Sequence, residues 1–142
     1  MADTADIAEM KNLLGTGFDA TIGLEYTEVT PDRVRAQWTV KPTLHQPAGI
    51  QHGGVYCSVV ESLASIGGTV WLGERGHVVG VNNNTDFLRA TREGTLTAEA
   101  NPIHRGRTSQ LWEVRISDES GRLVSKGQVR LANITDTAAI GN

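Results

Sequence analysis

Residues 54–73 read GVYCSVVESLASIGGTVWLG, and this segment decides the fold. Glu61 is its single charged residue, and the apolar positions cover a wide arc of a helix: Val55, Val59, Val60, Leu63, Ile66, Val70 and Trp71. A helix that is apolar over so much of its surface is expected to be mostly buried. Five small residues let a neighbouring element approach it closely: Ser58, Ala64, Ser65, Gly67 and Gly68. The segment therefore predicts one long central helix.

The sequence on both sides of this helix has the pattern of β-strands. After Gly76 we expect strands at about 78–90, 94–104, 107–118 and 122–133, separated by glycine-containing turns. Residues 22–40 predict a hairpin with Pro31 and Asp32 in its turn. The second arm of this hairpin places one set of apolar residues on one face: Val34, Ala36, Trp38 and Val40. One long helix against an antiparallel sheet is an α+β architecture.

Two segments before the central helix are expected to be short or irregular. Residues 41–54 predict a loop, because two prolines and three glycines interrupt regular structure there. Residues 5–14 predict a short amphipathic helix that ends at Gly15 and Gly17.

Length and composition describe an ordinary globular chain. Its 142 residues suit a single domain, and 39% hydrophobic with 20% charged residues argues against disorder. The net charge of −3 lacks the basic stripe of a nucleic-acid binder. No apolar run approaches the roughly 20 residues that a membrane span needs, and the acidic N-terminus does not resemble a signal peptide. With Cys57 as the lone cysteine, these features predict a cytoplasmic protein without an internal disulfide.

Glu61 is the first candidate for chemistry. A carboxylate in the most apolar segment of the chain is costly to bury, and desolvation would favour a role as a base near neutral pH. Alternatively, Glu61 lies on the one exposed stripe of the helix. Ser65 shares its face one turn later, where its hydroxyl could hold a water or bond the backbone carbonyl four residues back.

The second candidate is His52-Gly53-Gly54, directly before the helix. Glycine lets the backbone approach a ligand closely, and the amides at a helix N-terminus stabilise negative charge. A thioester carbonyl polarised there gains most as an oxyanion develops. The alternatives are a plain turn into the helix and a structural, hydrogen-bonded His52. Gln46, in the same loop, carries no signal by itself.

The third candidate is a cationic turn with the sequence His104-Arg105-Gly106-Arg107-Thr108, with Arg89 on the strand before it. Guanidinium groups and turn amides suit phosphate, although an ordinary polar β-turn has the same composition. The four histidines and one cysteine lack the spacing of a zinc site, so no metal is expected.

Together these motifs resemble those of the hotdog-fold thioesterases: HQP at 45–47, QHGG at 51–54, Glu61 with Ser65, VVG at 78–80 and HRGR at 104–107. The branch that looks most similar is typified by the phenylacetate-pathway and hydroxybenzoyl-CoA thioesterases. The resemblance covers roughly residues 18–133 and implies that residues 1–142 form a single hotdog domain. It also implies an acyl-CoA thioesterase that needs no separate cofactor, with CoA as part of the substrate.

The resemblance assigns a role to each candidate residue. The Gly53 amide polarises the thioester carbonyl, and Glu61 is either the nucleophile or the general base for water. Gln46 and His52 orient the thioester, and Ser65 positions water or Glu61. The site lies between two subunits of a homodimer, and pairs of dimers commonly form a homotetramer. The turn formed by His104, Arg105, Gly106, Arg107 and Thr108, with Arg89 as a helper, meets the CoA nucleotide.

The sequence also departs from part of this pattern. Members that act on aromatic acyl groups often carry a polar residue on the strand after the helix. Here residues 82–88 read NNNTDFL, in which Phe87 and Leu88 are apolar, and this argues against a hydroxybenzoyl substrate. Four polar residues could instead face the site or the partner subunit: Asn82, Asn83, Asn84 and Asp86.

Two other functions remain open at this point. A hotdog hydratase or dehydratase needs an acid five residues before the histidine, and Pro47 occupies that position before His52. A non-catalytic acyl-CoA-binding module needs the arginines but not Glu61. The acyl group, and the choice between CoA and an acyl carrier protein, are not determined by these motifs.

Overall fold

The computed structural model describes residues 14–135. Within these residues, two helices, two short 3₁₀ turns and six strands follow one another in the order α2 (Gly17–Ile22), β1 (Glu25–Val29), β2 (Val34–Thr39), η1 (Pro42–Leu44), α3 (Gly53–Leu72), η2 (Gly73–Arg75), β3 (His77–Phe87), β4 (Thr95–Arg105), β5 (Ser109–Ser117) and β6 (Leu123–Ile134).

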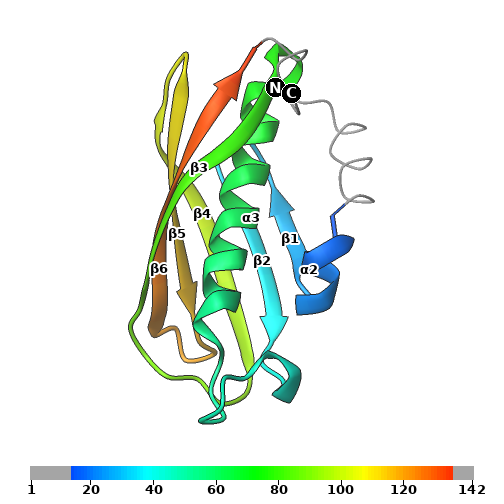
Figure 1. Ribbon diagram of the computed structural model, residues 1–142, viewed down its shortest axis with the longest axis vertical. Helices are drawn as coiled ribbons and strands as arrows, with labels where there is room; N and C mark the ends of the chain where they lie inside the picture. The colour runs from blue at the N-terminus through cyan, green and yellow to red at the C-terminus, as the bar shows by residue number, and fades with distance from the viewer. Residues whose placement is uncertain (1–13, 136–142) are drawn as a thin grey trace.

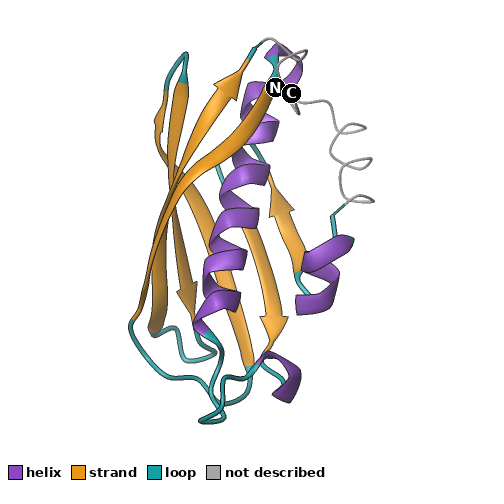
Figure 2. Ribbon diagram, in the orientation of Figure 1, coloured by secondary structure: helices purple, strands orange, loops and turns teal. Residues whose placement is uncertain are grey.

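The six strands form one antiparallel sheet in the order β1-β2-β4-β5-β6-β3. The sheet curves around α3, which runs along its inner face (Figures 1 and 2). This arrangement confirms the predicted α+β hotdog fold. The helix begins one residue before its predicted start, and each strand after it matches its expected range within a few residues.

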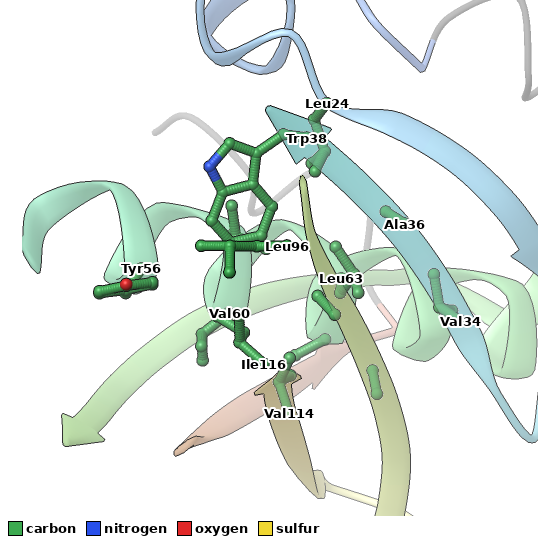
Figure 3. Close-up of a cluster of buried hydrophobic side chains, with 14 of the residues drawn as sticks. Leu24, Val34, Ala36, Trp38, Tyr56, Val60, Leu63, Leu96, Val114 and Ile116 are labelled. Carbon is green, nitrogen blue, oxygen red and sulfur yellow. The ribbon is translucent and has the colours of Figure 1, made fainter. Parts of the chain in front are cut away.

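The core fills the space between α3 and the sheet. Its largest buried side chains include Trp38, Trp112 and Leu63, and Figure 3 shows part of this cluster. The small residues of α3 have the predicted effect. A Cβ atom on Gly67 would lie 2.6 Å from the Trp112 ring, so only glycine lets the indole pack this closely against the helix.

The segment before the first strand differs from the prediction. Gly17 begins α2, although we expected this glycine to end a helix. Tertiary contacts stabilise α2, because the Asp19 carboxylate accepts hydrogen bonds from Tyr26 on β1 (2.8 Å) and Ser62 on α3 (2.7 Å). The helix predicted at 5–14 lies outside the described residues except for Leu14. The 41–54 loop also contains the short turn η1, which we did not expect.

The expectation that no segment is apolar enough to span a membrane was wrong. Gly53–Arg75, which is 23 residues long, contains an 18-residue window with a mean hydropathy of 1.3, so it is long and apolar enough to cross a membrane by length and composition. More than half of this window is buried inside the domain, which is the behaviour of a core helix.

One edge strand of the sheet is long and carries exposed apolar side chains. β3 has a neighbour, β6, on one side only, and its other side is the end of the sheet. Val81 is 57% exposed and Phe87 is 56% exposed on this strand, and Val79 is also exposed. Long apolar edge strands are templates for pairing with another chain.

Candidate active site

The N-terminus of α3 presents an unsatisfied backbone donor. His52 caps the helix, because its Nδ1 atom accepts a hydrogen bond from the Gly54 amide at 2.8 Å. The Gly53 amide is different, since it has no hydrogen-bond acceptor within residues 14–135. The first amides of a helix lack intrahelical partners and carry the positive end of the helix dipole. Gly53 can therefore donate to a ligand that develops negative charge.

A buried glutamine fixes the loop that leads into this helix. Gln51, only 3% exposed, donates to the Leu44 carbonyl at 2.6 Å and accepts from the Trp38 indole at 3.0 Å. The His52 amide donates to the same Leu44 carbonyl at 2.9 Å. These bonds attach both ends of the 44–52 loop to the core. Gln51 belongs to the QHGG motif at 51–54, but its role could not be predicted from the sequence because its hydrogen-bond partners come from other segments.

A pocket of about 270 Å³ lies beside the helix N-terminus. It brings together three residues predicted for the site, namely Gln46, Gly53 and Arg89. The other lining residues are mainly apolar or aromatic: Ile50, Gln51, Tyr56, Phe87, Leu88 and Ala90. The Gln46 side-chain oxygen accepts from the Ala48 amide, which leaves its NH₂ group available to a ligand.

Two aromatic rings form one wall of this pocket. Tyr56 and Phe87 lie with ring centroids 5.9 Å apart, and a Cβ atom on Gly53 would lie 2.6 Å from the Phe87 ring. Glycine at position 53 therefore lets an aromatic side chain cover the helix N-terminus closely. Burial raises the pKa of the Tyr56 hydroxyl above its ordinary value.

Glu61 lies in the middle of α3, half-buried and turned toward β3. Its Oε2 atom accepts a hydrogen bond from the Asn83 side-chain amide at 3.1 Å. A Cβ atom on Gly80 would collide with Oε1, so the carboxylate packs directly against the backbone of β3. Glu61 is thus neither fully buried nor on an exposed stripe, the two alternatives open from the sequence. The carboxylate is held in one place and still reaches solvent.

A single chain does not bring Glu61 and Gly53 together. Eight residues of helix separate them, which at 1.5 Å per residue is about 12 Å along the axis. A reacting group must approach its target atom to about 3–3.5 Å. Ser65 lies one turn further along α3, and its hydroxyl makes no hydrogen bond to the described residues. A hydrogen bond from the hydroxyl to the backbone carbonyl four residues back, which we considered for Ser65, is made by two other residues. Ser58 donates to the Gly54 carbonyl, and Thr69 donates to the Ser65 carbonyl.

His52 faces away from the Gly53 pocket. Its ring lines a separate cavity of about 460 Å³ between α2, the 43–45 segment and the start of α3. Because Nδ1 accepts the Gly54 amide, the proton of the neutral ring is on Nε2. His52 therefore caps the helix through Nδ1, which is the hydrogen bond expected of the structural alternative.

The cationic turn between β4 and β5 is partly used within the chain. The Arg105 guanidinium donates to the Pro31 carbonyl at 2.8 Å and to the Asp32 carboxylate at 2.9 Å. The side chain of Asn133 donates to the Gly106 carbonyl at 2.9 Å, and its backbone amide donates to the Thr108 carbonyl at 3.0 Å.

The two other basic side chains of this turn are exposed. Arg107 has no ion-pair partner among the described residues, while His104 folds back over Gly106. Within residues 14–135, Arg107 is consequently the free cation of the turn.

We had expected Arg89 to lie next to this turn as a helper, but it does not. Strand pairing places Arg105 level with Gly80, through Gln110 and Leu131. Nine residues separate Gly80 from Arg89, which corresponds to about 30 Å of extended chain. The turn stands at the opposite end of the molecule from the N-terminus of α3 (Figure 1). Within residues 14–135, no group of three or more potential metal ligands is present.

A sequence profile described as "Thioesterase superfamily" matches residues 48–125, more than half of the chain. The matched segment includes α3 with Gly53 and Glu61, and all of β3 with Asn83. The chain belongs to the thioesterase superfamily. Its branch within the superfamily is not fixed by this match.

Several relatives in this superfamily carry names of esterases or thioesterases. The chain is 52% identical over 120 residues to "Putative esterase Rv1847" of Mycobacterium tuberculosis, covering 82% of this chain and 86% of that protein. It is 34% identical to the 1,4-dihydroxy-2-naphthoyl-CoA hydrolase of Listeria monocytogenes, covering 82% and 94%. It is 37% identical to the proofreading thioesterase EntH of Cronobacter turicensis, covering 71% and 74%.

The solved structure of the Mycobacterium tuberculosis protein has the same fold. It superposes with a TM-score of 0.82, covering 83% of this chain and 96% of that one. The segment that matches the superfamily profile thus lies in a domain whose architecture closely resembles that of the Mycobacterium tuberculosis protein.

Proposed function

We propose that this chain is an acyl-CoA thioesterase, which hydrolyses a thioester to a free acid and CoA. The observation that carries the proposal is the Gly53 amide, a free donor at a helix N-terminus in a pocket that also holds Gln46. A preorganised backbone donor stabilises the oxyanion that forms when a thioester carbonyl is attacked. The names of the relatives support the same reaction class.

The reaction also needs a base or nucleophile, and Glu61 supplies the carboxylate. Since Glu61 lies about 12 Å from Gly53 within one chain, the catalytic pair requires a second subunit. Gly53 and Gln46 of one subunit hold the carbonyl, and Glu61 of the partner subunit attacks or activates water. Ser65 lies near enough along the helix to help position that water.

The exposed edge of β3 offers a geometry for this shared site. Phe87 lies against Gly53, whereas Gly80 and Asn83 lie against Glu61. If two β3 strands pair antiparallel about a two-fold axis near Asn84, the Glu61 end of one strand meets the Phe87 end of the other. Glu61 then comes level with Gly53 of the partner subunit. Such a self-complementary contact is the usual form of a homodimer interface.

Assembly is therefore the first testable consequence. We expect light scattering to give at least a dimer of the 15.3 kDa chain at micromolar concentration, with a tetramer as a pair of such dimers. A Val81→Asp substitution places a charge on the exposed apolar edge and should lower both the mass and the activity. A wild-type monomer with full activity would contradict a shared site.

The CoA nucleotide gives a second consequence, at Arg107. Its exposed guanidinium has no ion-pair partner in the part of the chain that the structure describes, so it is free to bind phosphate. Arg107→Ala should raise KM on the order of 10-fold with little change in kcat, because this contact lies far from the reacting carbon. Steady-state kinetics measure both constants. Arg115→Ala, which removes an arginine already paired with Glu113, is the matched control and should leave KM unchanged.

The pocket walls indicate what kind of acyl group fits. Tyr56, Phe87 and Leu88 offer an apolar and partly aromatic surface beside the Gly53 amide. We place the chain near the phenylacetate-pathway and hydroxybenzoyl-CoA branch, which the HQP and HGG motifs and a relative named for a naphthoyl-CoA substrate support. The apolar side chain of Phe87 still argues against a hydroxybenzoyl group as the acyl group of the substrate.

A thiol-release assay over short, long and aromatic acyl-CoAs tests the proposal. We expect release of free CoA from at least one member of the panel, with a clear preference among acyl groups. Binding of acyl-CoA without release from any member would instead identify a non-catalytic acyl-CoA-binding module. Running the same panel with acyl carrier protein thioesters distinguishes the two carriers.

A further inference from the structure

We propose that Asn83 is a positioning residue that holds the Glu61 carboxylate in the orientation from which it acts. The inference rests on the proposed function, because it assigns a role to a group beside the proposed catalytic carboxylate. The Asn83 side-chain amide donates to Glu61 Oε2 at 3.1 Å and to the Cys57 carbonyl at 3.0 Å. One amide thus joins β3 to two successive turns of α3 at the carboxylate.

The orientation of this amide is itself fixed. The Thr85 hydroxyl donates to the Asn83 side-chain oxygen at 2.6 Å. Because the Asn83 side-chain oxygen accepts this bond, that oxygen points toward Thr85. The Asn83 NH₂ group, which can only donate, then points the other way, toward α3. Both hydrogens of that group then have acceptors, on Cys57 and on Glu61. The three side chains form a chain of bonds from Thr85 to the carboxylate.

The other carboxylate oxygen of Glu61 is held in place by strand β3. Oε1 lies against Gly80, where any side chain would collide with it. One oxygen is therefore bonded to Asn83 and the other packs against the β3 backbone. A carboxylate held on both sides has few rotamers available, which keeps it in a geometry from which it can act.

The hydrogen bond from Asn83 has no competitor among the described residues. Glu61 has no salt-bridge partner among the described residues, so Asn83 is its one polar partner there. The β3 residues that face Glu61, namely Gly80 and Asn83, carry no titratable group, and His77 and Asp86 lie toward the ends of the strand. On α3 the nearest titratable side chain is the Cys57 thiol, one turn away.

The test compares Asn83→Leu with a matched control elsewhere on the sheet. Asn101 donates to the Glu99 carboxylate at 3.2 Å, so Asn101→Leu removes the same kind of bond far from Glu61. For Asn83→Leu we expect kcat to fall about 10-fold with KM nearly unchanged. The loss should appear in kcat and not in KM, because the bond acts on the reacting carboxylate and not on substrate binding. Asn101→Leu should change neither constant.

Two further measurements keep the outcome clear. Thr85→Val removes the hydroxyl that orients Asn83, so it should lower kcat by less than Asn83→Leu does. The ¹³C NMR signal of the Glu61 carboxyl group, compared in wild type and Asn83→Leu, reports the hydrogen bond without turnover and should shift when the bond is lost. If Glu61→Gln loses activity while Asn83→Leu keeps the wild-type kcat and NMR signal, the positioning role is wrong and the thioesterase stands. If wild type hydrolyses no acyl thioester, the proposed function fails, and the NMR comparison alone decides the role of Asn83.

Discussion

Replacing Glu61 by glutamine is expected to lower kcat by about 100-fold or more, the scale of a lost general base. Glutamine keeps the size of the side chain and can still accept the hydrogen bond from Asn83. What it loses is the anionic oxygen, which acts either as nucleophile or as base. The loss should therefore appear in kcat rather than in KM. Steady-state kinetics on the best substrate of the acyl-CoA panel measure it.

Thermal unfolding on the same preparations separates catalysis from folding. The melting temperature of Glu61→Gln should hold or rise, because a half-buried charge is replaced by a neutral amide. Glu61→Asp keeps the charge but withdraws it by one methylene from Asn83 and Gly80, so it should also lose activity strongly. Near wild-type hydrolysis by Glu61→Gln would end the proposed mechanism, and an acyl-CoA-binding function would then lead.

Replacing Gly53 by proline is expected to lower kcat by about 10²- to 10³-fold, the cost of removing one oxyanion donor. Proline has no N–H, and the first position of a helix is the place where it is best tolerated. The backbone of His52, at φ −65° and ψ 132°, already has the conformation favoured before proline. The helix should therefore form normally without its free amide. Circular dichroism and kinetics together measure both effects.

Gly53→Ala is the control for this substitution. It adds the same Cβ atom, which would lie 2.6 Å from the Phe87 ring, but keeps the amide. Phe87 is exposed and can rotate, so alanine should alter KM more than kcat. Equal losses of kcat in the alanine and proline variants would show that crowding, and not the amide, is responsible.

The same two variants test whether the site is shared. Each should be nearly inactive alone. In a 1:1 mixture with free subunit exchange, half of the dimers pair Glu61→Gln with Gly53→Pro, and each such dimer has one intact site of two. Activity should then return to about a quarter of wild type. If both groups acted within one chain, no subunit would carry the intact pair and the mixture would stay inactive.

Much of the fold follows from the sequence because it depends on local pattern. The apolar arc of residues 54–73 can be satisfied only by burial, and the alternation at Val34, Ala36 and Trp38 places one face of a strand inside. Gly67 is a specific example, because the Trp112 ring packs where a side chain at position 67 would lie. The α2 helix was missed because its short sequence has little helical pattern, and Asp19 stabilises it through residues far along the chain.

The candidate site could be predicted only in part. The HGG motif locates the free amide, because glycines directly before a helix place a backbone donor at its N-terminus. The sequence also identifies Glu61, as the one charge in an apolar helix. It cannot tell that Arg105 is bonded to Asp32 while Arg107 is free, since composition is the same for both.

Sequence alone therefore determined the long helix and the strands, because helix and strand periodicity record which side chains face the core. Tertiary structure decided which side chains meet. Asn83 reaches Glu61 across 22 residues of sequence, and Gln51 joins Leu44 to Trp38, through contacts that no local pattern encodes. The rigid rise of α3 also keeps Gly53 and Glu61 apart, because a helix cannot bring residues eight positions apart into contact.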